Sequence, residues 1–260
     1  MSSDPIRLEV RGAAAHLILN RPEKRNALNA AMWEAIPVLL ERALGHDAVR
    51  LLVVSGAGGS FAAGADISEF EEVYATPERA EAYSRSIARA LDGLAAFPRP
   101  TLAMIEGACV GGGCGLALAC DMRFASEGSR FGITPGKLGL VYTLNDTARL
   151  VRAVGVPVAK DMLFSGRLLD AAEAFRVGLV NRLVPVDRLA GEVETYVSLL
   201  AATSPNSARV TKKLIALMEA GQAEDDDATR ALFLEAFTSA DFEEGYRAFL
   251  EKRSPEFGKG

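Results

Sequence analysis

The chain has 260 residues, of which 49% are hydrophobic and 24% charged, and its formal net charge at pH 7 is −5. This length and balance are typical of a soluble globular protein with one large domain or a domain and an appendage. The acidic balance gives no electrostatic basis for binding nucleic acid, and no uncharged run is long enough to span a membrane.

The first predicted elements alternate between strands and helices. In chain order they are a hairpin at residues 6–11 and 15–19, a helix capped by Asn29 and ending at Gly45, a strand at 49–54, a helix pair within 67–96, a strand at 101–105, a helix after Gly112 and a strand at 122–125. This βαβ alternation predicts an α/β architecture that is rich in parallel strands.

The last third of the chain has a different pattern. From Asp187 onward, apolar residues recur at helical spacing. The acidic run at 224–227 favours the start of a helix, where negative charge is stabilising, over a metal site. We therefore predict an α-helical appendage, and such appendages commonly pack against another subunit or close a site.

Cysteines and histidines exclude two kinds of site. Cys109, Cys114 and Cys120 fit neither a CxxC pair nor a zinc pattern, which favours small buried side chains and predicts no metal. His16 lies in a strand-like stretch and His46 in a loop, so a Ser-His-Asp hydrolase is not expected. The first residues lack the basic start and apolar core of a signal peptide, so we expect a cytoplasmic protein.

Two glycine-bearing turns, at 61–67 and 111–113, each follow a predicted strand and precede a predicted helix. Consecutive glycines let backbone N–H groups approach a ligand closely. Two such groups from separate turns that converge on one oxygen would form an oxyanion hole. Tight turns without a ligand are an equally good interpretation. Gly115, beside the second turn, has no proton to give.

Nucleotide-binding motifs fail on detail. Residues 56–58 begin like a dinucleotide fingerprint, but Phe61 occupies the required third glycine position. The Gly-Lys pairs at 136–137 and 258–259 are not followed by the Ser or Thr of a P-loop.

Six ordered segments that together extend over nearly the whole chain resemble the crotonase superfamily, the enoyl-CoA hydratase/isomerase family. They are LNRPEKRNALN at 19–29, FAAGADI at 61–67, EGACVGGG at 106–113, FGITP at 131–135, AEAFRVGLVNRLV at 172–184 and EGYRAFLEKR at 244–253. The resemblance implies an α/β spiral of ββα units that binds an acyl-CoA thioester over residues 1–195. It also implies a helical C-terminal trimerisation region over 196–260, giving a homotrimer or a dimer of trimers.

The resemblance also implies site residues. The N–H groups of Ala65 and Gly112 would hold the thioester oxygen. The coenzyme A portion, which is part of the substrate and not a separate cofactor, would be bound by residues near the first turn and by two from the tail: Lys24, Arg25, Ala27, Ala63, Asp66, Ile67, Phe249 and Lys252. For each basic residue, a solvated surface charge is at least as good an interpretation.

Hydratases of this family carry two glutamates that handle water and the α-proton. By the same resemblance these fall at Gly115 and Pro135, and neither residue can transfer a proton. An aspartate used by some isomerases and dehalogenases falls at Thr143. The expected reaction therefore does not follow the ordinary hydratase pattern.

Residues 138–147 are similar to the corresponding stretch of the family's methylmalonyl-CoA decarboxylases. Tyr142 would orient a carboxylate or donate a proton, or only pack. Asp146 would act as a general acid or base, although a helix N-cap at Asn145 or Asp146 is the favoured interpretation. Glu69 would face the pocket or remain solvated. These positions predict a decarboxylase-like enzyme; the alternatives are a hydratase or isomerase using Asp146 or Glu69, and a non-catalytic acyl-CoA-binding protein.

Overall fold

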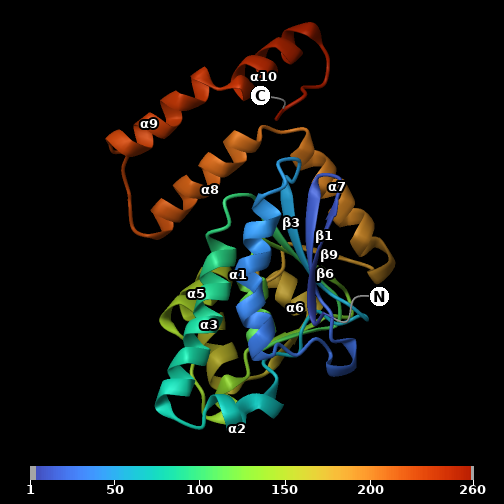
Figure 1. Ribbon diagram of the computed structural model, residues 1–260, viewed down its shortest axis with the longest axis vertical. Coiled ribbons are helices and arrows are strands. Elements are labelled where there is room, and N and C mark those ends of the chain that lie inside the picture. Colours follow the sequence, from blue (N-terminus) through green and yellow to red (C-terminus); the bar gives the residue numbers. More distant parts are fainter. Residues whose placement is uncertain (1–3, 259–260) are drawn as a thin grey trace.

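A six-stranded sheet forms the centre of the chain, in a computed structural model that describes residues 4–258 (Figure 1). The strand order is β1-β2-β3-β4-β6-β9. The strands are β1 (Ile6–Arg11), β2 (Ala14–Leu19), β3 (Leu51–Gly56), β4 (Thr101–Ile105), β6 (Met122–Ser126) and β9 (Arg182–Val184). Only the β1–β2 hairpin is antiparallel within this sheet, so the parallel-rich prediction is confirmed.

Strand β3 is buried on both faces, as its apolar run predicts. Leu52 and Val54 belong to the main core. Leu51 and Val53 belong to a smaller core on the other face of the sheet, which includes Leu189 from a later helix. The strand begins at Leu51 and not at residue 49, because Val49 belongs to a turn in which its N–H donates to the His46 carbonyl.

Helices α1 (Ala30–Leu44) and α3 (Pro77–Ala95) lie side by side against the main core (Figure 1). Asn29 caps α1 as predicted, since its side chain accepts a hydrogen bond of 3.0 Å from Met32 N. The predicted helix pair at 67–96 consists of a 3₁₀ turn (Ile67–Glu69), the short α2 (Phe70–Val73) and α3. These elements follow the first glycine turn, and residues of α3 line the same cavity as the second glycine turn.

A second sheet of three strands, ordered β5-β7-β8, lies beyond the main sheet. Its strands are β5 (Ala108–Val110), β7 (Arg130–Gly132) and β8 (Leu168–Asp170). Helix α4 (Gly112–Leu118) follows β5, and a 3₁₀ turn (Pro135–Leu138) and α5 (Leu144–Ser165) follow β7. Helix α6 (Ala171–Arg176) follows β8. Strand–strand–helix units therefore follow one another along the chain. The second glycine turn connects β5 to α4.

The chain from residue 186 onward is helical, which confirms the prediction for this part. Helix α7 (Leu189–Ala201), preceded by a 3₁₀ turn (Val186–Arg188), covers the smaller core, and the predicted division after residue 195 falls inside it. Helices α8 (Pro205–Glu219), α9 (Asp227–Glu235) and α10 (Ala240–Glu251), with a 3₁₀ turn (Ala236–Thr238), extend away from the body (Figure 1). Asp226 caps α9 in a capping box with Thr229, so the acidic run does start a helix.

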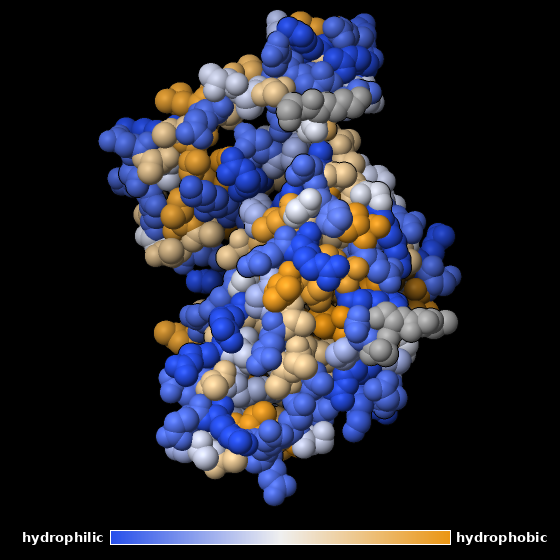
Figure 2. Space-filling view, in the orientation of Figure 1, coloured by the Kyte–Doolittle hydropathy of each residue, from blue (hydrophilic) through white to orange (hydrophobic). Residues whose placement is uncertain are grey.

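Apolar side chains remain exposed along this helical arm, and Figure 2 shows apolar surface over it. They are Ile215, Met218, Phe233, Leu234, Phe237, Phe242, Tyr246, Phe249 and Leu250. Exposed apolar patches on folded chains are typical of surfaces for association. Among the helices of residues 4–258, none combines the length and the apolar character that crossing a membrane requires.

Candidate active site

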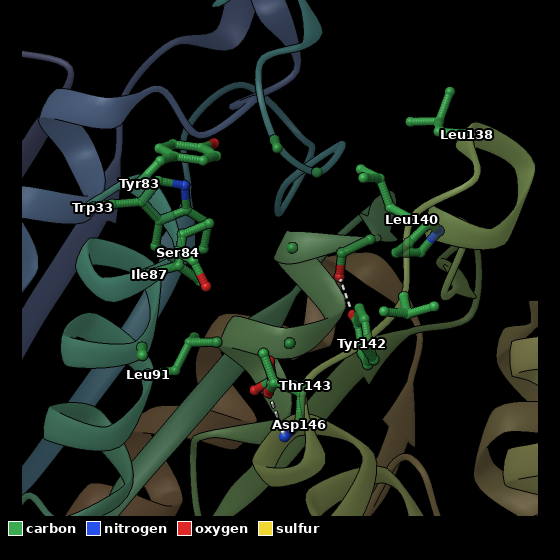
Figure 3. A pocket seen from close by; sticks show the side chains of 18 of the residues that line it. Trp33, Tyr83, Ser84, Ile87, Leu91, Leu138, Leu140, Tyr142, Thr143 and Asp146 are labelled. Carbon is green, nitrogen blue, oxygen red and sulfur yellow. Dashed lines mark hydrogen bonds between the residues drawn. The ribbon is translucent and has the colours of Figure 1, made fainter. Parts of the chain in front are cut away.

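A cavity of about 290 Å³ lies where the two glycine turns meet α1, α3 and the segment before α5 (Figure 3). Its wall is mostly apolar and aromatic, with a few polar groups. The lining comprises Trp33, Ala63, Gly64, Ala65, Ile67, Phe70, Tyr74, Tyr83, Ser84, Ile87, Ala88, Leu91, Asp92, Gly111, Gly112, Gly115, Thr134, Pro135, Leu138, Leu140, Val141, Tyr142, Thr143, Asn145 and Asp146. Concave sites of this kind bind small molecules.

The first turn presents the N–H of Ala65 toward this cavity. Leu28 N donates to Gly64 O at 2.8 Å, and Asp66 N donates to Leu28 O at 2.8 Å, so both neighbours of Ala65 are paired. Ala65 N itself has no protein acceptor within residues 4–258. Gly64 has φ 115°, and a Cβ there would lie 3.2 Å from Val110 O, so this close approach of the two turns requires glycine.

The second turn presents the N–H of Gly112. Gly111 N donates to Gly132 O at 2.8 Å, while the Gly111 carbonyl accepts from Gly115 N at 3.0 Å. Gly112 N, like Ala65 N, lacks a protein acceptor in the part of the chain that the structure describes. A Cβ on Gly112 would lie 3.6 Å from Ala65 N. The two unpaired N–H groups therefore lie close together, at the cavity that both residues line.

Asp66 holds the first turn and does not line the cavity. Its carboxylate accepts from Ser68 Oγ at 2.6 Å and Ser68 N at 3.1 Å, and pairs with Arg21 at 2.8 Å. The Ser68 hydroxyl, with help from Arg21, lowers the pKa of this carboxyl below 3.8. The carboxylate therefore already has three partners, which favours a structural role over direct contact with coenzyme A.

Asp66→Asn is expected to lower the free energy of unfolding at pH 7 by about 1–3 kcal/mol, because a buried charged hydrogen-bond network is broken. Since the folded pKa is depressed, the stabilisation is present above the unfolded value of 3.8 and lost as pH falls through the folded pKa. Urea unfolding at pH 7 and pH 3 measures this, with the exposed Asp187→Asn as the matched control. An equal deficit at both pH values would contradict the assignment.

Tyr142 lies across the cavity from α3 (Figure 3). The Tyr142 hydroxyl donates to the Gly111 carbonyl at 2.7 Å. A Cβ on Gly115 would lie 3.6 Å from the Tyr142 hydroxyl oxygen. Burial raises the pKa of the Tyr142 phenol well above its ordinary value. The phenol thus stays protonated at neutral pH and supports the turn that carries Gly112.

Asp146 lines the cavity but does not cap α5, which corrects the sequence interpretation. The N-cap is Thr143, whose hydroxyl accepts from Asp146 N at 3.2 Å and donates to Asp146 Oδ2 at 2.8 Å. Asp146 Oδ1 pairs with Arg149 at 2.9 Å. Thr143 takes the extended backbone that a cap requires, so α5 begins at Leu144, before the two predicted cap positions. Both carboxylate oxygens are therefore engaged.

Glu69 does not face the cavity, contrary to one expectation, nor is it simply solvated. Its Oε2 accepts from Ala30 N at 2.8 Å, at the first turn of α1. Gly115 and Pro135, the positions where the resemblance places the hydratase glutamates, both line the cavity.

Apart from Asp66, the residues expected to bind coenzyme A fall into three groups. Ala63 and Ile67 line the cavity. The loop at 24–27 lies next to them, because Ala63 N donates to Arg25 O at 3.0 Å, and Lys24 and Arg25 are exposed.

Phe249 and Lys252 lie in and just after α10, outside the cavity lining of this chain. Phe249 is 82% exposed.

Trp33 of α1 and Tyr83 of α3 are among the cavity residues that were not identified from sequence. Both have helical spacing and are almost fully buried, which from sequence is typical of ordinary core positions. Cys109, Cys114 and Cys120 are buried and free, and burial raises the pKa values of Cys109 and Cys120. Residues 4–258 contain no group of three or more side chains suited to a metal ion.

Comparisons with known proteins agree on one family. The sequence pattern described as Enoyl-CoA hydratase/isomerase matches residues 9–260. A Thermus thermophilus protein named as an enoyl-CoA hydratase is 38% identical over 250 residues, covering 95% of this chain and 98% of that protein. The crotonyl-CoA hydratase of Syntrophomonas wolfei is 34% identical over 265 residues, covering 99% of both.

Solved structures give the same result. An enoyl-CoA hydratase/isomerase family protein of Hyphomonas neptunium has a TM-score of 0.95 with 47% identity over 98% of each chain. The enoyl-CoA hydratase of Bacillus anthracis has a TM-score of 0.89 with 29% identity, covering 99% of this chain and all of that one. These matches confirm the predicted fold class.

Proposed function

This chain belongs to the enoyl-CoA hydratase/isomerase family, and from that premise we propose that it binds an acyl-CoA thioester and stabilises its enolate. The observation that carries the proposal is the pair of unpaired N–H groups of Ala65 and Gly112, which lie close together at the cavity. Preorganised donors at the position of a developing oxyanion contribute about 3 kcal/mol each to such a state.

The enolate is formed by decarboxylation, because the cavity offers no free base. Among the lining residues, the titratable groups are Tyr74, Tyr83, Tyr142, Asp92 and Asp146. Both carboxylates pair with Arg149, and burial raises the pKa of all three phenols. Loss of CO2 needs no base: the electrons of the broken C–C bond pass to the thioester carbonyl, and water then protonates the α-carbon.

The electrostatics of the wall support this reaction. No Lys, Arg or His occurs among the lining residues that the structure describes. An ionised acyl carboxylate buried without a cation is costly, and its conversion to neutral CO2 removes that cost. Tyr142 holds the second turn in place through Gly111 and does not act as the acid.

The coenzyme A portion lies along the exposed loop that carries Lys24 and Arg25, next to Ala63 at the cavity. Ammonium and guanidinium groups are suited to phosphates. The same side of the site includes Ala27 and Ile67. Asp66 contributes indirectly, because its hydrogen bonds hold the backbone of the first turn. Phe249 and Lys252 act on the coenzyme A of a neighbouring copy.

The exposed apolar side chains of α8–α10 are covered by copies of the same chain in a homotrimer or a dimer of trimers. Light scattering tests this assembly. A monomer that persists at every concentration would overturn it.

A panel of CoA thioesters followed by mass spectrometry tests the proposed reaction. Malonyl-type esters are expected to lose CO2, while crotonyl-CoA stays unchanged. Hydration of crotonyl-CoA with survival of the malonyl esters would instead support a hydratase that uses Asp146, the reaction that the name of the Syntrophomonas wolfei relative describes. Tight binding without turnover would support a non-catalytic acyl-CoA-binding protein.

A further inference from the structure

Trp33 and Tyr83 form the cavity wall beside the two backbone donors (Figure 3). A Cβ on Gly112 would lie 3.2 Å from Trp33 Cζ2 and 3.6 Å from Ala65 N. The indole ring therefore adjoins the space that the Ala65 and Gly112 N–H groups share. A group held by this wall would lie only a few bonds from the thioester oxygen.

Both side chains have a buried polar atom without a partner. Trp33 is 0% exposed and Tyr83 is 5% exposed. Neither Trp33 Nε1 nor Tyr83 Oη forms a hydrogen bond with any part of the chain that the structure describes. A buried donor left unsatisfied costs about 1–3 kcal/mol. Two of them beside one ligand cavity therefore call for an acceptor that the chain itself does not supply.

The two atoms act as donors near each other. Burial raises the pKa of the Tyr83 phenol to about 12, and the Trp33 indole N–H opposes part of that rise. The phenol is therefore protonated at neutral pH, and an indole N–H only donates. An oxygen with lone pairs that lies against this wall can accept from these donors.

We propose that Tyr83 Oη and Trp33 Nε1 bind an acceptor oxygen on the β-carbon of the acyl group. This inference rests on the proposed function, since it assumes that the thioester oxygen lies at Ala65 and Gly112. Malonyl and 3-oxoacyl thioesters share this chemistry: each carries a carbonyl or carboxylate oxygen on the β-carbon. Simple saturated and enoyl thioesters lack it and leave both donors unpaired.

Tyr83→Phe tests the inference, because it removes one hydroxyl and keeps the ring. Calorimetry measures the affinities for acetoacetyl-CoA and butyryl-CoA, which have acyl chains of equal length, and steady-state rates give kcat/KM for malonyl-CoA. Tyr83→Phe is expected to weaken acetoacetyl-CoA binding or malonyl-CoA kcat/KM by about five- to tenfold, as expected for one hydrogen bond. The affinity for butyryl-CoA is expected to stay constant or rise.

The two oxygenated probes separate a ketone from a carboxylate as the natural acceptor, and a loss with either one supports the inference. Tyr196→Phe is the matched control and is expected to change nothing, because Tyr196 is a half-buried residue of α7 outside the cavity lining. Equal affinities of wild type and Tyr83→Phe for acetoacetyl-CoA, with unchanged malonyl-CoA kinetics, would overturn the inference, as would the same loss in Tyr196→Phe. Failure of wild type to bind any of the three thioesters would instead overturn the proposed function.

Discussion

Gly112→Ala is expected to lower kcat for the reactive thioester by about 10²-fold or more. The new methyl group would lie 3.6 Å from Ala65 N and 3.2 Å from Trp33 Cζ2. It would fill the space that we propose for the thioester oxygen. Alanine suits the backbone of Gly112, which begins α4 without a positive φ. The fold is therefore retained, and the loss reflects displacement of the oxygen from its donors.

Gly191→Ala is the matched control for this substitution. Gly191 lies in α7, has no positive φ, and a Cβ there would meet nothing within 4 Å. Its kcat is expected to equal that of the wild type, and thermal unfolding of both variants checks folding. If a folded Gly112→Ala kept full turnover, the assignment of the two N–H groups would be wrong.

The double variant Gly115→Glu, Pro135→Glu is expected to hydrate crotonyl-CoA at least about 10²-fold faster than wild type, the scale of general acid–base catalysis. Both positions line the cavity, and a Cβ on Gly115 makes ordinary contacts of 3.6 Å with Tyr142 Oη and 3.7 Å with Leu91 Cδ1. Replacing Pro135 keeps the backbone carbonyl of residue 135, so the 3.0 Å hydrogen bond from Leu140 N is retained. Malonyl-CoA turnover is expected to fall, because the new carboxylates repel the substrate carboxylate.

Glutamine at the same two positions is the control, since it matches the size of glutamate but transfers no proton. The expected gain is confined to the glutamate variant and is measured by the loss of enoyl absorbance. An equal gain in the glutamine variant would show that Gly115 and Pro135 do not determine the reaction. A wild-type hydration rate above that of the glutamate variant would show the same.

Local patterns predicted the parts of the fold that depend on nearby residues. Asn29 caps α1 through Met32, three residues away, and β3 is recognisable from its unbroken apolar run. The α5 cap was misplaced because Thr143, Asn145 and Asp146 are all chemically able to cap a helix. Only the backbone angles distinguish them.

Contacts between distant residues determined what the sequence could not predict. Glu69 accepts a hydrogen bond from Ala30 N, 39 positions away. Residues near Glu69 in the sequence therefore could not indicate that its side chain lies outside the cavity lining. Trp33 and Tyr83 converge because α1 packs on α3, and each alone has the pattern of an ordinary core residue. The two glycine turns were identifiable because their backbone geometry depends on glycine, whereas their proximity depends on the fold.

We propose that this site stabilises an enolate but has no base to form one from a C–H bond. Incubation of malonyl-CoA and propionyl-CoA with the enzyme in D2O, followed by mass spectrometry, tests it most directly. Malonyl-CoA is expected to give acetyl-CoA that carries solvent deuterium on its α-carbon, and propionyl-CoA is expected to show no enzyme-catalysed exchange. Rapid α-exchange of propionyl-CoA with malonyl-CoA left intact would contradict it.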